Sequence, residues 1–224
     1  MSTLFITATG TDVGKTFVSA GIVHALKQRT ENIAYYKPVE SGGIPQNGKF
    51  VSGDGQWVSD RTNLESIYNT YCFQKPMSPH IAAQLDKQVI EPHRIMEKYK
   101  SLIKKYDHVV VEGAGGLSVP LIDYKYMVYD LISDLNCELL IVADAGLGSI
   151  NHTTLTVALA DQLDLKVKGI VLNQYDDSMI HSENVKAIEA ITGKTVIAKI
   201  PTMKSEEFHA YFKSDFPIEK LFDI

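Results

Sequence analysis

The sequence predicts an α/β fold, a single-domain parallel β-sheet with helices on both faces. Strand-length apolar runs rich in Val and Ile recur along the chain, and segments of helical periodicity lie between them. Parallel strands buried on both faces have this composition, and the helices between them are the crossover connections that such a sheet needs. With 224 residues and 45% hydrophobic content, we expect one domain over residues 1–224.

The elements follow from these patterns in order along the chain. Strands are expected at residues 4–8, 33–37, 108–112, 139–143, 169–173 and 196–200. Helices are expected near residues 16–29, 55–66, 92–105, 151–163 and 182–191. The segment 40–79 is rich in Gly, Ser, Asn and Pro, so we expect a long irregular segment there, interrupted by the helix near 55–66. Long irregular segments in compact domains are usually functional or disordered.

Charge and composition argue against several classes of function. The net charge of −5 disfavours a nucleic-acid-binding surface, which needs clustered Lys and Arg. Cys72 and Cys137 lack C-x-x-C spacing, so neither a zinc site nor a redox pair is predicted. There is no basic, apolar leader at the N-terminus, and no apolar run approaches ~18 residues. We therefore expect a cytoplasmic protein that binds neither nucleic acid nor membrane.

A candidate phosphate-binding loop (P-loop) lies between the first strand and the first helix. Residues 7–16 read Thr-Ala-Thr-Gly-Thr-Asp-Val-Gly-Lys-Thr. In such a loop the backbone N–H groups wrap an anion, and the helix N-terminus adds partial positive charge. Lys15 would reach the β- and γ-phosphates, and the Thr16 hydroxyl would bind Mg²⁺. The common pattern has Gly where this chain has Thr9, and Gly10 comes one residue late.

Polar residues end the second strand, and ligands of an open parallel sheet bind at such strand ends. Lys37 is followed by Pro38, which keeps it close to the sheet, and we expect it to act as a second cation beside Lys15 rather than as a surface lysine. Ser41 fits two interpretations equally well, an ordinary turn residue or a hydroxyl donor to the substrate.

Three carboxylates are candidates for a metal site beside the phosphate loop. Glu112 ends the third strand and precedes Gly-Ala-Gly-Gly, which lets the backbone approach a ligand closely. Asp144 ends the fourth strand and is the rival; we prefer Glu112 because of its glycine run. Asp54 lies between two glycines, so it is either a turn residue or, if its loop folds over the phosphates, a metal ligand.

Two asparagines complete the set of candidates. Asn173 ends the fifth strand, and its donor and acceptor suit the Watson–Crick edge of adenine, although Asn is also a good turn former. Asn151 precedes a helix and is expected to be its N-cap. The free N–H groups at that helix start are a possible site for a carboxylate.

Five motifs together resemble dethiobiotin synthetase, the ATP-dependent ring-closing enzyme of biotin synthesis. They span most of the chain in the family's order. They are Thr11-Asp-Val-Gly-Lys-Thr16, Tyr36-Lys-Pro-Val-Glu-Ser-Gly42, Ser78-Pro-His80, Val111-Glu-Gly-Ala-Gly-Gly116 and Gly148-Ser-Ile-Asn-His152. The family's phosphate loop carries an extra residue, with its first Gly six positions before the Gly-Lys pair. Here that position is Ala8, and Gly10 stands where the family often has Asp or Asn.

The resemblance implies a homodimer that acts on 7,8-diaminononanoate, CO₂ or bicarbonate, ATP and Mg²⁺. Lys15 and Lys37 would be catalytic, and the metal ligands would be Thr16, Asp54 and Glu112, which favours Glu112 over Asp144. The implied ATP-binding residues are Asp12, Val13, Gly14, Lys15, Thr16, Phe17, Asp54, Glu112, Gly113, Ala114, Gly115, Asn173, Pro201, Thr202 and Met203. The implied substrate-binding residues are Thr11, Ser41, Gly148, Ile150 and Asn151, the last three from the neighbouring subunit.

The implied reaction joins two anions, a carbamate and a triphosphate, and therefore needs concentrated positive charge. An amine captures CO₂ as a carbamate, the carbamate attacks the γ-phosphate, and the second amine closes the ring with release of phosphate. On this basis we expect Lys37→Ala to lose orders of magnitude in turnover while folding normally.

Two other functions are alternatives on the sequence alone. Partition and division-site ATPases share this kind of sheet and a deviant loop, but they carry an extra lysine at the loop's start, and this chain has no lysine before Lys15. A small-molecule kinase would need an arginine-bearing lid, whereas Arg61 and Arg94 are isolated.

Overall fold

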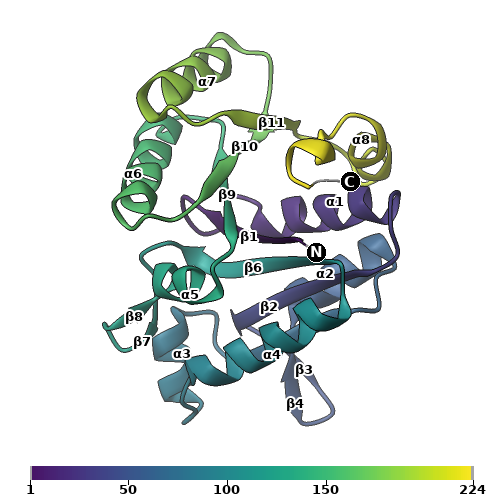
Figure 1. Cartoon of the computed structure of the whole chain (residues 1–224), viewed down its shortest axis with the longest axis vertical. Helices are drawn as coiled ribbons and strands as arrows, with labels where there is room; N and C mark the ends of the chain where they lie inside the picture. Colours follow the sequence, from purple (N-terminus) through teal and green to yellow (C-terminus); the bar gives the residue numbers. More distant parts are fainter. Residues whose placement is uncertain (1, 223–224) are drawn as a thin grey trace.

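A seven-stranded parallel sheet forms the centre of the computed structural model, which describes residues 2–222 (Figure 1). The strand order is β11-β10-β9-β1-β6-β2-β5. The strands are β1 Ser2–Ala8, β2 Ile33–Ser41, β5 Ile67–Phe73, β6 His108–Gly116, β9 Glu138–Asp144, β10 Val167–Tyr175 and β11 Val196–Pro201. Two small antiparallel hairpins lie outside the sheet, β3 Ile44–Gln46 with β4 Lys49–Val51 and β7 Pro120–Ile122 with β8 Tyr126–Met127.

Helices cover both faces of the sheet, which confirms the predicted fold class. One face packs against α1 Lys15–Lys27, α2 Gly53–Thr62, α8 Phe208–Ser214 and the 3₁₀ helix Ile218–Lys220. The other packs against α3 Pro79–Leu85, α4 Pro92–Lys105, α5 Val128–Leu135, α6 Ser149–Gln162 and α7 Met179–Thr192. Each face has its own buried apolar core, so the sheet lies between two hydrophobic layers.

Successive strand residues alternate between these two cores. On β2, Tyr35 packs in the core on the α1 side, whereas Tyr36 packs in the core on the opposite side. Both side chains are 0% exposed. The predicted strands were found because they are buried on both faces and therefore have apolar residues at nearly every position.

The structure corrects the expectation of an irregular segment over residues 40–79. That segment contains β3, β4, α2 and the edge strand β5. Strand β5 pairs along one side with β2 and is partly exposed, so its sequence mixes polar and apolar residues and lacks a continuous apolar run. The helices α3 and α8 have seven residues each, too few to show a clear helical period. The helix α5 was also not predicted, although Val128, Leu131, Ile132 and Leu135 stand at helical spacing in its eight residues.

The candidate phosphate loop follows the carboxyl end of β1, at the centre of the sheet. Strand β1 lies between β6 and β9, and both neighbours come much later in the chain. In open parallel sheets, ligands bind in a crevice beyond the carboxyl ends of the strands at the point where the strand order reverses. Ala8, the residue at the family's glycine position, is the last residue of β1 and is fully buried, which explains why a small apolar side chain suits it.

Along residues 2–222, the structure contains no helix whose length and apolar character would let it cross a membrane.

Candidate active site

The loop between β1 and α1 has the geometry of an anion-binding site. Gly14 is the N-cap of α1 and has a φ of 97°. A Cβ atom at this position would lie 2.1 Å from the Asn173 amide nitrogen, so glycine is required for both conformation and space. Among residues 2–222 no side chain caps α1, and the N–H groups of its first turn therefore face the end of the helix without intrahelical acceptors.

A cavity of about 760 Å³ opens beside this loop. It collects side chains from the phosphate loop and from the ends of β2 and β6, together with the start of α2 and the segment before α3. Its lining residues are Thr11, Asp12, Gly14, Lys15, Thr16, Phe17, Lys37, Glu40, Ser41, Asp54, Pro76, Met77, Ser78, Pro79, Glu112, Ala114, Gly115 and Val119. Most of the residues predicted for phosphate and metal binding therefore share one cavity.

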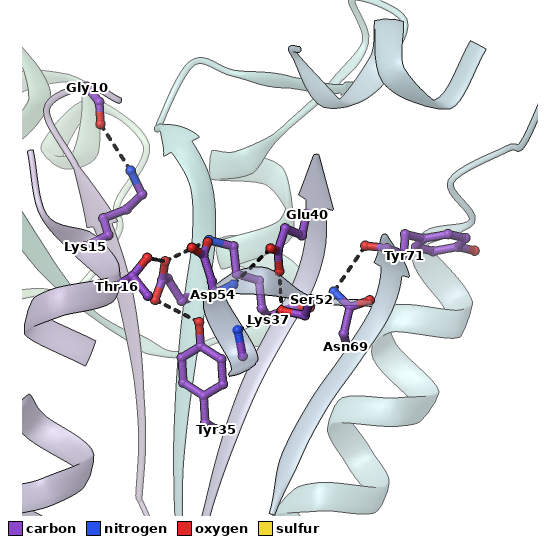
Figure 2. A network of polar contacts seen from close by, with 12 residues as sticks. Gly10, Lys15, Thr16, Tyr35, Lys37, Glu40, Ser52, Asp54, Asn69 and Tyr71 are labelled. Atoms are coloured by element: carbon purple, nitrogen blue, oxygen red, sulfur yellow. Dashed lines mark hydrogen bonds and ion pairs between the residues drawn. The ribbon is translucent and has the colours of Figure 1, made fainter. Parts of the chain in front are cut away.

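At the floor of the cavity, Lys37 lies between two carboxylates. Its ammonium nitrogen is 2.7 Å from Oε1 of Glu112. The same nitrogen donates a hydrogen bond to Asp54 (Figure 2). The Thr16 hydroxyl donates to the same Glu112 oxygen at 2.8 Å, and the Tyr35 hydroxyl donates to Oε2 at 2.8 Å. The network joins the phosphate loop, β2, β6 and α2, although Thr16 and Glu112 are separated by 96 positions in the sequence.

Burial and charge oppose each other in this network. Burial lowers the pKa of Lys37, but Glu112 and Asp54 outweigh burial, so the pKa lies above the usual value for lysine. Burial by itself raises the pKa of Glu112, but the charge of Lys37 and the hydrogen bonds that Glu112 accepts outweigh burial, so the pKa lies below the usual value for glutamate. The pKa of Lys15 is lowered by burial, against the attraction of Glu112. The site holds two ammonium groups close to carboxylates in a desolvated environment.

Asp54 lies in the first turn of α2, which corrects its expected position in an irregular loop. Ser52 is the N-cap of α2 and accepts a hydrogen bond from the N–H of Gly55 at 2.8 Å. Glu40 accepts hydrogen bonds from the Ser52 hydroxyl and, at 3.0 Å, from the N–H of Asp54. Burial raises the pKa of Glu40, and the hydrogen bond from Ser52 partly opposes this shift. Glu40 thereby fixes the start of the helix that carries Asp54.

The donor atoms suit a magnesium ion. Thr16, Asp54 and Glu112 supply a hydroxyl and two carboxylates, and Mg²⁺ prefers oxygen ligands. Across residues 2–222, no group of three or more His, Cys, Asp or Glu side chains is placed to hold a metal by itself. Mg²⁺ usually takes one or two carboxylates and completes its shell with water and substrate phosphates, so this set fits a nucleotide-dependent site.

Asp144, the rival carboxylate, takes part in a turn at the end of β9. Its Oδ1 atom accepts a hydrogen bond from the N–H of Gly146 at 2.7 Å. It does not belong to the lining of the cavity in the described part of the chain.

The residues expected around adenine lie outside the cavity lining. Asn173 is buried, and its amide nitrogen donates to the backbone oxygen of Val13 at 3.0 Å, so the side chain supports the phosphate loop. Pro201, Thr202 and Met203 follow at and beyond the end of β11, the strand next to β10. Their role in binding a nucleotide base stays a prediction.

The residues expected to bind the substrate carboxylate lie at the start of α6, away from the cavity lining. The N-cap of this helix is Gly148, with a φ of 86°, and the helix begins at Ser149. The expectation that Asn151 is the N-cap is therefore wrong: it is the third residue of the first turn, because Gly148 can adopt the left-handed conformation. Gly148 and Asn151 are exposed, and Ile150 is half-buried.

Sequence reasoning assigned no role to Tyr35 or Glu40. The signal was the alternation along β2, which places Tyr35 on the same face of the sheet as Lys37. Sequence reasoning also assigned no role to five other residues that line the cavity, Pro76, Met77, Ser78, Pro79 and Val119. Of these, Ser78 and Pro79 belong to a motif that the sequence shares with the dethiobiotin synthetases.

Solved structures with the same fold come from ATPases of partition and cell division. A ParA family ATPase from Chlorobium tepidum is 19% identical with a TM-score of 0.59, and the match covers 99% of this chain and 92% of that one. The cell division protein MinD from Aquifex aeolicus is 17% identical with a TM-score of 0.59, covering 98% and 95%. At these identities the likeness is one of fold.

Sequence comparison gives a closer relationship. A family model described as an AAA domain matches residues 2–208. Proteins described as ATP-dependent dethiobiotin synthetase BioD are 40% identical in Clostridium kluyveri, over 90% of this chain and 86% of the relative, and 41% identical in Anoxybacillus flavithermus, over 91% and 93%. In Clostridium novyi the identity is 39%, over 95% and 92%. The chain belongs to the family of ATP-dependent dethiobiotin synthetases.

Proposed function

We propose that the protein catalyses the ATP- and Mg²⁺-dependent carboxylation and ring closure of 7,8-diaminononanoate to dethiobiotin, with release of ADP and phosphate. The observation that carries this proposal is the ion-pair group of buried Lys37 and Glu112 with half-buried Asp54, which lies in one cavity with Lys15 of the phosphate loop. A reaction between two anions needs such a concentration of positive charge next to a metal-binding oxygen set.

The first steps form and activate a carbamate. One amine of the substrate attacks CO₂ and loses a proton, which gives a carbamate anion. A carbamate oxygen then attacks the γ-phosphorus, the bond to the bridging oxygen breaks, and ADP leaves. The product of this step is a mixed carbamic–phosphoric anhydride. Lys15 and the N–H groups at the start of α1 would hold the phosphates in line, and Lys37 would neutralise the carbamate as it approaches.

Ring closure completes the reaction. The second amine attacks the activated carbonyl carbon, the carbon–oxygen bond to phosphate breaks, and the amine loses a proton. Phosphate and the cyclic urea are released. Lys37 and Glu112 line the cavity and are almost completely buried, so the anhydride would form where bulk water has little access.

Thr16, Asp54 and Glu112 would hold Mg²⁺, and the bound ion would offset the negative charge of the phosphates. In this structure the Lys37 ammonium supplies the positive charge between the two carboxylates. With Mg²⁺ held by Asp54 and Glu112, the same ammonium would be available to the carbamate.

We further propose that the enzyme is a cytoplasmic homodimer in which Gly148, Ile150 and Asn151 of one subunit receive the substrate carboxylate bound at the other. Two observations support this assignment. The three residues lie at an exposed helix start, where N–H groups attract anions, and outside the cavity of their own chain.

The test of the reaction is incubation with 7,8-diaminononanoate, labelled bicarbonate and ATP. We expect label in an acid-stable cyclic product together with free phosphate. ATP hydrolysis stimulated by DNA or lipid without the diamine, or a stable phosphorylated product, would reject the proposal. Lys37→Ala is expected to reduce turnover by at least ~100-fold while retaining ADP binding, and near-full turnover would reject its assigned role.

A further inference from the structure

Glu112 uses its two carboxylate oxygens differently. Oε1 faces the cavity side of the network, where it accepts hydrogen bonds from Thr16 and Lys37. Oε2 accepts a hydrogen bond from the Tyr35 hydroxyl at 2.8 Å. Glu112 and Tyr35 are both 0% exposed, so water cannot readily replace this donor.

The sheet brings Tyr35 to this position. In the register of β2 and β6, Tyr35 lies opposite Val110, two residues before Glu112 and on the same face. The ring of Tyr35 packs among apolar side chains on the α1 side of the sheet, which restricts its rotation. The packed ring therefore holds the hydroxyl in hydrogen-bonding distance of Oε2 of Glu112.

We propose that Tyr35 is a positioning residue for metal binding, because it holds Oε2 of Glu112 and so keeps Oε1 turned toward Thr16. This inference rests on the proposed function, in which Glu112 and Thr16 bind Mg²⁺. Residues that hydrogen-bond a metal-binding carboxylate restrict its orientation, and their loss commonly weakens metal binding about 10–100-fold. Without the hydroxyl, Oε2 loses its donor, and the carboxylate is restrained through Oε1 by Thr16 and Lys37.

A neighbouring tyrosine provides a matched control. Tyr36 is equally buried, but it faces the other side of the sheet, where its hydroxyl contacts Thr70 at 2.6 Å. Tyr35→Phe and Tyr36→Phe each remove one buried hydroxyl from adjacent positions of the same strand. Both variants are therefore expected to lose comparable stability, whereas only Tyr35→Phe removes a hydrogen bond to Glu112.

The experiment is a titration of the purified protein with Mn²⁺ in the presence of ADP, followed by water-proton relaxation. We expect about 10-fold weaker Mn²⁺ binding for Tyr35→Phe and at most about twofold for Tyr36→Phe, while ADP binding in EDTA is unchanged. In steady-state assays, Tyr35→Phe should need more Mg²⁺ for half-maximal velocity and recover most of its kcat at saturating Mg²⁺.

Glu112→Gln separates the inference from the metal site on which it rests. If Glu112→Gln weakens Mn²⁺ binding but Tyr35→Phe does not, or if both tyrosine variants weaken it equally, the role of Tyr35 is rejected and the metal site stands. If Glu112→Gln binds Mn²⁺ like the wild type, the metal site and the role of Tyr35 are both rejected.

Discussion

The Lys37 ammonium lies 2.7 Å from Oε1 of Glu112, and both side chains are almost completely buried at the carboxyl end of the sheet. The pair joins β2 to β6 and leaves the Lys37 charge without access to bulk water. An ion pair in this environment contributes little net stability, but removing one partner leaves the other charge buried without compensation. Lys37 is therefore expected to contribute to the stability of the fold as well as to the proposed reaction.

We accordingly expect Lys37→Met to be destabilised by about 3–5 kcal/mol at neutral pH, because it leaves Glu112 uncompensated. This replaces the expectation from sequence that a Lys37 variant folds normally. The free energy of unfolding from urea denaturation is the measurement. The double variant Lys37→Met/Glu112→Gln should recover part of the loss, and a double variant as unstable as the sum of the two single ones would contradict the explanation.

Gly14→Ala should disrupt the phosphate loop. The φ of 97° and the contact with Asn173 predict a loss of about 1–3 kcal/mol and weaker ADP binding. Gly10→Ala is the matched control, since a Cβ atom there meets nothing within 4 Å. Thermal unfolding and ADP titration monitored by the fluorescence of Trp57, the chain's single tryptophan, measure both effects. Equal effects at the two glycines would contradict the geometric argument.

Glu40 should stabilise the start of α2. Glu40→Ala leaves the N–H of Asp54 and the hydroxyl of Ser52 without their acceptor, so we expect a loss of about 1–3 kcal/mol and reduced activity. Glu40→Gln keeps an acceptor in the same place and should lie within about 1 kcal/mol of the wild type. Urea denaturation and initial velocities compare the two. The role assigned to Glu40 predicts that glutamine rescues the alanine variant.

The packing of α8 against α1 should depend on pH through His24. Burial, followed by the nearby His209, lowers the pKa of His24 from 6.5, and the two rings are 4.7 Å apart between their centroids. Below pH 6.5 the unfolded chain then binds more protons at His24 than the folded chain does. The contribution of neutral His24 to the free energy of unfolding is therefore fully present above pH 6.5 and is lost as pH falls through the lowered pKa.

The measurement is the free energy of unfolding at about pH 7.5 and about pH 5.5 for the wild type and His24→Gln. We expect a smaller decrease for the variant. His108 also has a lowered pKa because of burial, so part of the decrease should remain. Equal decreases in the two proteins would show that His24 does not contribute.

The shared active site can be tested with mixed dimers. Asn151→Asp places a negative charge where the substrate carboxylate is proposed to bind, while aspartate remains favourable at a helix start. If each site uses Lys37 of one subunit and Asn151 of the other, a random mixture of Lys37→Ala and Asn151→Asp chains contains half heterodimers, each with one intact site. Recovered activity should be about a quarter of the wild type. A mixture no more active than the two variants measured separately would contradict a shared site.

The sequence by itself determined the fold class and the chemistry of the phosphate loop. Both depend on local signals: continuous apolar runs predict buried parallel strands, and Gly14-Lys15-Thr16 between a strand and a helix predicts an anion site. The motif Val111-Glu-Gly-Ala-Gly-Gly116 also singled out Glu112, because the carboxylate and the following glycines are adjacent in the chain. The expected strand end at Glu112 is wrong, since β6 continues to Gly116.

Tertiary structure alone decided which side chains meet. The edge strand β5 escaped sequence reasoning because exposure on one side removes the apolar pattern of a buried strand. Tyr35 lies 77 positions from Glu112, and their hydrogen bond depends on the register between β2 and β6. Glu40 likewise reaches Asp54 only because α2 packs against β2. Local propensity does not specify strand register or helix docking. The hydrogen bonds of Tyr35 and Glu40 to the candidate metal-binding residues could therefore be identified only from the folded chain.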